Sequence, residues 1–300
     1  MLKVSHLRIA FRIDGRLSVP VRDVSFHIPR AGRVALVGES GCGKSLTALA
    51  VGGLVDRAEI SGEIEGSPRI SYIFQNPTAS LDPVMRTGRQ VAEALPPGYS
   101  RRGKVGRVRE LFAAVGLDPS LSERYPCELS GGQCQRVMIA TAIAAEPELL
   151  IADEPTTALD VTTQREVLDL IERVSGERGA AVLLITHNLG LVSRYSDFVN
   201  VMYAGEIVES GKVADVLSSP RHPYTSGLIA AVPRLDAPKD APLSDIPGTV
   251  PPPWDWPKGC AFHPRCPHAV EECSSEDFSI CRFRAGGICH DGSPARGTGD

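Results

Sequence analysis

A chain of 300 residues is long enough to bury one large domain, or a domain with an extension. Its 42% hydrophobic and 23% charged residues are ordinary for a soluble protein, and a net charge of −4 excludes a strong overall bias toward nucleic acid. No apolar run reaches the roughly 18 residues that a membrane span needs, and the N-terminus lacks the apolar core of a signal peptide, so we expect a cytoplasmic protein.

The first 33 residues have the pattern of antiparallel strands with one solvated face. Apolar and polar residues alternate over residues 7–13, a turn falls at Asp14-Gly15, and the alternation resumes over residues 21–28. Phe11 lies in the first of these runs. It is either a core residue or an aromatic platform for a nucleotide base, and its spacing alone favours the core.

The stretch Gly38–Ser45 reads GESGCGKS and fits the phosphate-loop pattern. It lies between a short apolar run and a helical one, which is the strand, turn and helix context that this motif requires. Glycines let backbone N–H groups point at a phosphate, and the start of the helix adds the positive end of its dipole. Lys44 would neutralise the β and γ phosphates, and the Ser45 hydroxyl would bind Mg²⁺, which prefers oxygen ligands. The alternative is a chance glycine-rich turn.

The pattern from about Thr87 to Glu146 is helical, with breaks at residues 96–98 and 118–119. A basic run in this segment lacks interleaved aromatic residues, so it indicates a solvated helix face better than a nucleic-acid patch. Leu129–Gln133 reads LSGGQ, and Ser130 is a good N-cap for the helix that follows. Two phosphate-type turns in one chain either bind two ligands or each supply half of a site shared across a dimer.

Polar side chains come directly after several apolar runs, namely Gln75, the pair Asp153 and Glu154, and His187. Because α/β proteins bind ligands at the carboxyl ends of their strands, these residues are candidate nucleotide contacts. Asp153 would hold Mg²⁺ through water, Glu154 would polarise the attacking water, and His187 would contact a γ-phosphate. Plainer alternatives exist, since adjacent acids often form a solvated turn and a lone histidine is usually structural.

In this order the motifs resemble those of the ATP-binding cassette (ABC) ATPases of import systems. The corresponding elements are the Walker A loop Gly38–Ser45, the Q-loop residue Gln75, the LSGGQ signature, the Walker B strand ending in Asp153 and Glu154, the D-loop residues 158–160 and the switch His187. The resemblance implies ATP and Mg²⁺ as cofactors. It also reverses the interpretation of Phe11, which falls where the family carries its adenine-stacking aromatic residue.

The same resemblance implies a set of site residues. The catalytic residues are Glu154, His187 and Gln75, and the Mg²⁺ ligands are Ser45, Gln75 and Asp153. The nucleotide contacts are Phe11, Gly38, Ser40, Gly41, Cys42, Gly43, Lys44, Ser45, Leu46, Ser130, Gly131, Gly132, Gln133 and Asp160.

The fold that the resemblance implies is α/β, with a RecA-like P-loop NTPase core, an antiparallel β subdomain, a helical signature-bearing subdomain and a cysteine-rich C-terminal extension. Residues 1–235 would form the nucleotide-binding domain, with the helical subdomain at about 87–146, and residues 236–300 the proline-rich, cysteine-rich extension. In this family two domains pair head to tail, so that each Walker A loop faces the partner's LSGGQ. The chain is therefore expected to need a second ATPase subunit.

Finer features are similar to the oligopeptide/dipeptide and nickel importer branch. They are Phe74–Pro77 continuing through Ser80–Val84, then Pro220–Thr225 and Gly259–Pro267. The branch implies an ATPase that powers peptide uptake, a homologous partner ATPase in a heterodimer, two membrane permeases and an extracytoplasmic solute-binding protein. It places the chain at the cytoplasmic face of the inner membrane, without nucleic acid.

Three other functions compete with peptide import. One is import of nickel or another small solute. Another is a soluble cassette ATPase acting on ribosomes or DNA, which is less favoured because such proteins carry two cassettes or a long coiled-coil insertion. The third is a redox sensor with residual ATPase, which the complete motif set argues against.

Five of the eight cysteines fall between residues 260 and 289, in the C-terminal tail, by which we mean residues 236–300. The tail begins with a proline-rich stretch over residues 236–257, which is expected to run extended across a surface. In a reducing compartment such a cluster indicates metal before disulfide, and its gaps are longer than zinc pairs usually show. Similar tails in the importer branch hold a [4Fe-4S] cluster, which the resemblance favours over the alternatives of zinc or free thiols. The resemblance implies Cys260, Cys266, Cys273 and Cys289 as its ligands, with Cys281 as the alternative to Cys289.

Overall fold

A computed structural model describes residues 1–157, 159–232 and 245–275. The chain divides into two compact units. The first comprises Met1–Ile28, Arg33–Gly66 and the described residues from Ile185 onward, and the second comprises Pro29–Gly32 and Ser67–Leu184. Among the described helices, none combines the length and apolar character needed to cross a membrane.

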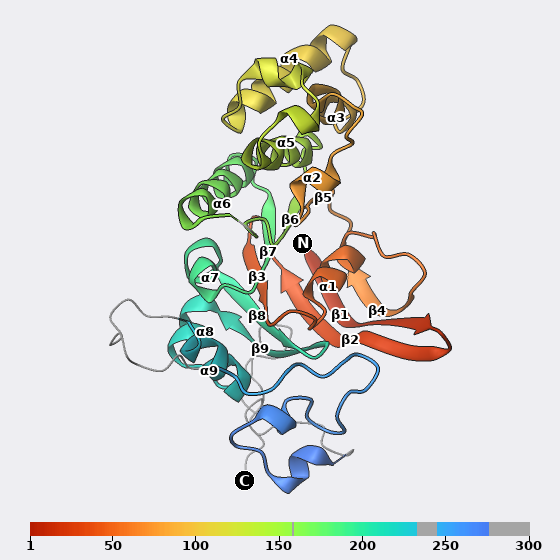
Figure 1. Cartoon of the computed structure of the whole chain (residues 1–300), viewed down its shortest axis with the longest axis vertical. Coiled ribbons are helices and arrows are strands. Elements are labelled where there is room, and N and C mark those ends of the chain that lie inside the picture. The colour runs from red at the N-terminus through yellow and green to blue at the C-terminus, as the bar shows by residue number, and fades with distance from the viewer. Residues whose placement is uncertain (158, 233–244, 276–300) are drawn as a thin grey trace. The chain divides into compact units, whose positions relative to one another are not determined.

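The first unit is built on strands in the order β4-β1-β2-β9-β8-β3 (Figure 1). The hairpin of β1 and β2 turns at Asp14 and Gly15, which both have positive φ, as a tight hairpin turn requires. β1 and β2 pair in the antiparallel sense, which confirms the prediction for the first 33 residues. β4 also pairs with β1 in the antiparallel sense, whereas β3 and β8 are parallel. The bounds are β1 (Leu2–Ile13), β2 (Arg16–Ile28), β3 (Arg33–Val37), β4 (Glu59–Glu65), β8 (Phe198–Tyr203) and β9 (Glu206–Lys212).

In the first unit, α1 follows β3, and the other helices lie in the C-terminal part of the chain. The bounds are α1 (Lys44–Val51), α7 (Leu189–Tyr195), α8 (Val213–Ser218), α9 (Pro223–Ala230) and the 3₁₀ turns η3 (His263–Arg265) and η4 (Glu271–Ser274). Phe262, just before η3, is only 2% exposed and belongs to the same hydrophobic cluster as Tyr203 and Tyr224. Its ring centroid lies 5.1 Å from that of Tyr203 and 5.4 Å from that of Tyr224. The tail therefore contributes to the core of this unit instead of only crossing its surface.

The second unit contains strands in the order β7-β6-β5, of which β5 and β6 are parallel. The bounds are β5 (Ile70–Ile73), β6 (Leu149–Asp153) and β7 (Ala181–Thr186), whose last two residues belong to the first unit. Every residue of β6 is buried, and the strand ends in Asp153, as expected for the Walker B strand. An apolar strand that ends in a carboxylate delivers that group to the carboxyl edge of the sheet.

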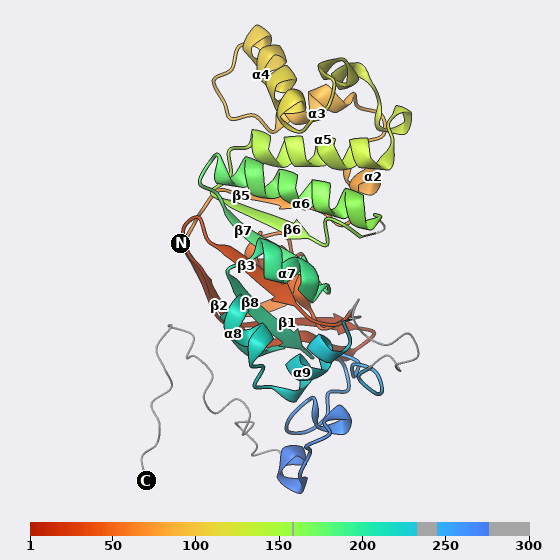
Figure 2. The same ribbon diagram turned by 90° about the vertical axis from the view of Figure 1, so that its left-hand side faces the viewer.

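Helices make up most of the second unit. In Figures 1 and 2, α5 lies between α6 and the pair α3 and α4. The bounds are α2 (Pro77–Ser80), α3 (Thr87–Glu93), α4 (Arg101–Ala114), α5 (Gly131–Ala144), α6 (Val161–Gly176) and the 3₁₀ turns η1 (Pro119–Glu123) and η2 (Pro126–Glu128). The predicted breaks separate α3 from α4 and α4 from η1, so the helical prediction for this segment is confirmed.

Candidate functional site

The phosphate loop connects β3 to α1 in the first unit, as the motif predicts. Gly38 and Gly43 have φ values of 153° and 101°, which side-chain-bearing residues rarely adopt. A Cβ atom at Gly38 would lie 2.1 Å from the carbonyl oxygen of Met202, and one at Gly43 would lie 2.7 Å from that of Pro20. Only glycine fits these two positions, so the loop backbone is held tightly against its neighbours.

Lys44 and Cys42 fill the inside of this loop. The Lys44 ammonium donates hydrogen bonds to the carbonyl oxygens of Gly38, at 2.8 Å, and Glu39, at 2.9 Å, and it lies 3.8 Å from the Cys42 sulfur. The Cys42 side chain is fully buried, and burial raises the pKa of its thiol, so the group stays protonated at neutral pH. The loop therefore combines the Lys44 ammonium with a neutral Cys42 thiol.

Phe11 and His187 are also in the first unit. Phe11 lies on β1, is half-buried and pairs across the hairpin with Ser18. His187 is exposed and directly follows β7, and the next residue, Asn188, caps α7 by accepting a hydrogen bond from the Gly190 N–H. Both side chains are thus accessible enough to contact a ligand.

Asp153 ends β6 in the second unit and is 6% exposed. The Tyr72 hydroxyl donates a 2.8 Å hydrogen bond to its Oδ2 atom. Burial, with the neighbouring Asp153 charge and this hydrogen bond, raises the pKa of Tyr72 well above its usual value. The hydroxyl proton is therefore retained, and it orients the carboxylate.

Glu154 follows at the end of the strand and has a φ of 44°, a left-handed conformation that non-glycine residues seldom adopt. Its Oε2 atom accepts hydrogen bonds from the Gln75 amide, at 3.0 Å, and from the Thr157 hydroxyl, at 2.9 Å. The structure therefore brings together two residues, Gln75 and Glu154, to which the sequence assigned catalytic roles. Strained backbone of this kind is commonly found at functional sites.

The LSGGQ signature forms the start of α5 in the second unit. The Ser130 hydroxyl accepts a hydrogen bond from the Gln133 N–H, and the Gln133 side chain accepts one from the Ser130 N–H. This reciprocal capping box confirms Ser130 as the predicted N-cap. Asp160 caps α6 through the N–H groups of Thr162 and Thr163, and the hydrogen bonds from Thr163 are the main cause of its lowered pKa.

ATP and Mg²⁺ suit the groups found in these two units. A Cβ atom on Gly41, Gly131 or Gly132 would meet nothing within 4 Å, so the backbone at both glycine turns has room for an anion beside it. The predicted Mg²⁺ ligands Ser45, Gln75 and Asp153 all supply oxygen atoms, which is the donor type that Mg²⁺ prefers.

The predicted iron–sulfur cluster is wrong. Across residues 1–157, 159–232 and 245–275, no group of three or more His, Cys, Asp or Glu side chains could hold a metal ion. Cys273 is buried in η4, while Cys260 and Cys266 are half-buried beside the aromatic cluster of the first unit. Their surroundings are those of hydrophobic packing, which is a common role for cysteine. Cys289 and its alternative Cys281 lie outside the described residues.

Sequence reasoning missed three residues that hold site residues in place. They are Tyr72, which contacts Asp153, and Tyr224 and Arg265, which both contact Glu39 of the phosphate loop. For Tyr72 the sequence does carry a signal, since the hydroxyl of a tyrosine in a mostly apolar strand usually needs a polar partner. Arg265 lies 226 residues from Glu39, so no local pattern in the sequence connects them.

Two family descriptions match the chain. Residues 21–157 match the ABC transporter family, and residues 208–273 match the C-terminal region of oligopeptide/dipeptide transporters. Relatives that cover nearly the whole chain agree with both matches. The chain therefore belongs to the ABC transporter ATPases of the oligopeptide/dipeptide type.

Individual relatives bear closely related names. The chain is 41% identical to the oligopeptide transport ATP-binding protein AppD of Bacillus subtilis, over 95% of this chain and 94% of the relative. It is 45% identical to a putative peptide import ATP-binding protein of Brucella ovis, over 91% of each. It is also 43% identical to OppD of Mycobacterium tuberculosis, covering 91% of this chain but only 48% of that relative. The chain thus spans about half the length of this mycobacterial protein.

Solved structures show the same fold. A dimeric structure of a post-hydrolysis state of the ATP-binding cassette MJ0796, bound to ADP and Pi, superposes with a TM-score of 0.64 at 25% identity, covering 71% of this chain and 99% of that chain. CbiO1 from Clostridium perfringens, part of the ABC transporter complex cbiONQ, gives a TM-score of 0.62 at 26% identity, covering 73% and 90%. These likenesses confirm the mixed α/β cassette fold.

Proposed function

We propose that this chain is the ATP-hydrolysing subunit of an ABC importer that carries di- and oligopeptides across the cytoplasmic membrane. One observation carries the proposal. The chain has more than 40% sequence identity to relatives named as oligopeptide transport or peptide import ATP-binding proteins, over nearly the full length of both chains. The match of residues 208–273 to the oligopeptide/dipeptide transporter C-terminal region supports the same substrate class.

In this proposal the first unit binds the nucleotide through its phosphate loop and β1. The backbone N–H groups of Gly38–Ser45 and the Lys44 ammonium bind the phosphates, and Phe11 stacks on the adenine. The Ser45 hydroxyl is a ligand of the Mg²⁺ ion that accompanies ATP. His187, exposed after β7, contacts the γ-phosphate.

The second unit supplies the groups that act on water. Glu154 accepts a proton from the attacking water, and the hydrogen bonds from Gln75 and Thr157 hold its carboxylate in one orientation. Asp153, oriented by Tyr72, is a Mg²⁺ ligand together with Gln75. When bound, Mg²⁺ neutralises charge on the phosphates.

The signature helix start acts on a partner's nucleotide. Ser130–Gln133 would face the Walker A loop of a second, homologous ATPase subunit, and Asp160 would lie at the same interface. The dimeric MJ0796 structures support a paired arrangement. We further propose that residues 1–235 form the cassette, with a RecA-like core, an antiparallel β subdomain and a helical subdomain at about 87–146, and that residues 236–300 extend it.

The partners follow from this function. Two membrane permeases would receive the pair of ATPase subunits at the cytoplasmic face of the inner membrane, and an extracytoplasmic solute-binding protein would deliver the peptide. The test is transport by the complex assembled with its own permeases in vesicles. Internal ATP should drive uptake of a labelled oligopeptide presented with the binding protein, and uptake of Ni²⁺ without peptide uptake would refute the proposed substrate.

Glu154→Gln tests the catalytic assignment in the same complex. The amide keeps the size of the side chain but cannot accept the proton, so ATP hydrolysis should fall by about 10²- to 10⁴-fold while ATP binding persists. Thr157→Ala is the matched comparison, because it removes one hydrogen bond to Glu154 and leaves the carboxylate. Near-normal hydrolysis by Glu154→Gln would rule out this role.

A further inference from the structure

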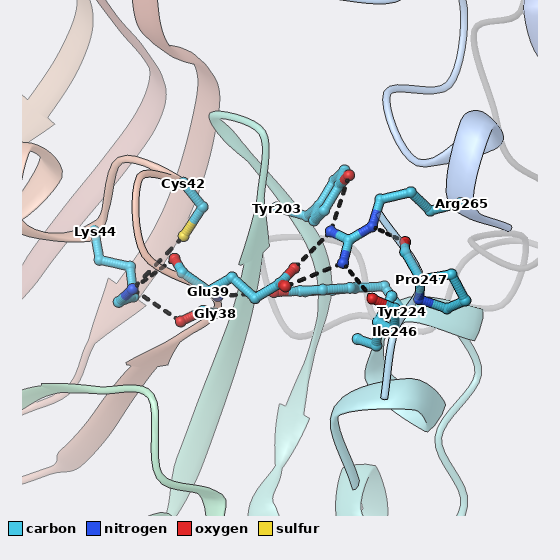
Figure 3. A network of polar contacts seen from close by, with 9 residues as sticks. All are labelled: Gly38, Glu39, Cys42, Lys44, Tyr203, Tyr224, Ile246, Pro247 and Arg265. Atoms are coloured by element: carbon cyan, nitrogen blue, oxygen red, sulfur yellow. Dashed lines mark hydrogen bonds and ion pairs between the residues drawn. The ribbon is translucent and has the colours of Figure 1, made fainter. Parts of the chain in front are cut away.

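Glu39 is the second residue of the phosphate loop, and its carboxylate forms a two-pronged ion pair with Arg265 of the tail. The two guanidinium nitrogens donate to Oε2 and Oε1 of Glu39 at 2.8 and 3.1 Å (Figure 3). The Arg265 side chain is only 4% exposed, whereas that of Glu39 is 31% exposed. Paired arginine and carboxylate groups in this fork geometry are among the stronger hydrogen-bonded contacts in proteins.

The guanidinium is itself fixed from its other sides. Its nitrogens donate to the carbonyl oxygens of Pro247 at 2.7 Å and of Ile246 at 2.9 Å, and its carbon lies 5.8 Å from the centre of the Tyr203 ring. Burial alone would lower the pKa of Arg265, but the hydrogen bonds and charges of Glu39 and Tyr203 together raise it. Arg265 is therefore a permanent, immobilised positive charge beside the loop.

A second segment reaches the same loop residue. The Tyr224 hydroxyl accepts a 2.8 Å hydrogen bond from the Glu39 N–H, while the Glu39 carbonyl oxygen accepts one from Lys44. Tyr224 is fully buried at the start of α9, where His222 caps the helix. The N–H, the carbonyl and the carboxylate of Glu39 are thus all engaged (Figure 3).

The tail also contacts the strand that pairs with Phe11. The Trp256 indole N–H donates to the Val19 carbonyl oxygen at 2.9 Å, and the Val19 N–H donates to the Pro253 carbonyl oxygen at 2.9 Å. Val19 is next to Ser18, the cross-strand partner of Phe11. Within the first unit, the tail therefore contacts the phosphate loop and the strand that pairs with Phe11.

We propose that Arg265 is a positioning residue for ATP binding that acts through Glu39: its charge neutralises that carboxylate, so that the phosphate loop accepts a triphosphate. A carboxylate in a loop that binds a polyanion would repel it, and Arg265 cancels that charge. This inference rests on the proposed function, because it concerns the affinity of the same loop for ATP. It assigns a nucleotide-binding role to the C-terminal extension.

The test is the affinity of the full-length chain for a fluorescent N-methylanthraniloyl derivative of ATP with Mg²⁺. Arg265→Gln leaves the Glu39 charge uncompensated and should weaken binding by about ten-fold, more so at low salt. Glu39→Gln should change affinity little, and the double variant Glu39→Gln/Arg265→Gln should recover most of the lost affinity. Lys3→Gln is the matched control, because it removes the cation of an exposed ion pair in the same unit.

Recovery of ATP affinity in the double variant distinguishes charge neutralisation by Arg265 from a purely structural role of this residue. If the double variant binds as weakly as Arg265→Gln, or if Arg265→Gln binds like the wild type, the inference is overturned. Tyr224→Phe keeps the ring but loses the hydroxyl, so it should weaken binding by about three- to ten-fold and thereby test the second contact to Glu39. Should Arg265→Gln not fold, as judged by thermal unfolding, Arg265→Met takes its place, since methionine also removes the charge but keeps an unbranched apolar stem in the buried site. An unchanged affinity in Arg265→Met would then overturn the inference.

The proposed function and this inference fail differently. A wild-type chain that does not bind the ATP derivative would refute the proposed function and this inference with it. A wild-type chain that binds, with an unaltered Arg265→Gln variant, would refute the inference alone.

Discussion

Tyr72→Phe isolates the hydrogen bond that orients Asp153. The substitution removes one hydroxyl oxygen and keeps the ring, including its packing against Phe74 at 4.5 Å between centroids. No cavity larger than that oxygen is created, so the effect should come mainly from the lost 2.8 Å contact to the carboxylate. Asp153 is 6% exposed, and water is poorly placed to replace the missing donor.

The expected cost is therefore that of a hydrogen bond to a charged group, about 1.5–3 kcal/mol in the free energy of unfolding. With a urea dependence of about 2 kcal/mol per molar, the unfolding midpoint should fall by about 1 M. The affinity for Mg²⁺ in the presence of ATP should fall as well, since the carboxylate is no longer held in one orientation.

Far-UV circular dichroism is a better probe of this unfolding than tryptophan fluorescence. Trp254 and Trp256 are the only tryptophans of the chain, and both lie in the first unit, whereas Tyr72 lies in the second. Tyr99→Phe, a substitution at a more exposed tyrosine of the second unit, serves as the control and should leave the midpoint nearly unchanged. A Tyr72→Phe midpoint within about 0.2 M of the wild type would contradict the reasoning, since the lost contact would then be worth less than about 0.5 kcal/mol.

Two further predictions follow from pKa values. Cys127 is exposed, whereas Cys42 is buried with a raised thiol pKa, so N-ethylmaleimide at pH 7 should label Cys127 before Cys42, as mass spectrometry of peptides would show. Equal labelling rates would contradict this. Hydrogen bonds from Arg33 are the main cause of the lowered pKa of Asp197, so the pair stabilises the fold above about pH 4 and this contribution is lost as the pH falls through the lower folded-state value. Asp197→Asn should therefore lower the unfolding temperature at pH 7 but have a smaller effect at pH 3, and an equal loss at both would refute the assignment.

Features set by local sequence were predictable. The phosphate loop lies between β3 and α1 because an apolar run, a turn with three glycines and a helical run follow one another directly. Ser130 caps α5 because a serine hydroxyl can accept the N–H three residues later. The Asp14-Gly15 turn likewise reflects the backbone preferences of those two residues.

Features that depend on distant residues were not predictable. The ion pair of Arg265 and Glu39 joins segments that only the folded chain brings together. A polar partner for Tyr72 could be expected, but not that it would be Asp153, which is 81 residues away. The iron–sulfur prediction failed for the same reason. Cysteines that are close in sequence need not turn their sulfur atoms toward one point, and Cys273 instead lies buried in η4.

The packing of Phe262 against Tyr203 and Tyr224 limits how this chain can be divided or recombined. A shortened chain that stops at residue 235 would expose the rings of Tyr203 and Tyr224, which are now fully buried. This would create an aggregation-prone apolar patch beside the phosphate loop. A chimera that joins this cassette to the tail of another transporter must supply an aromatic side chain at position 262 that fits the same space. Cassette and tail should accordingly be exchanged between transporters as one piece.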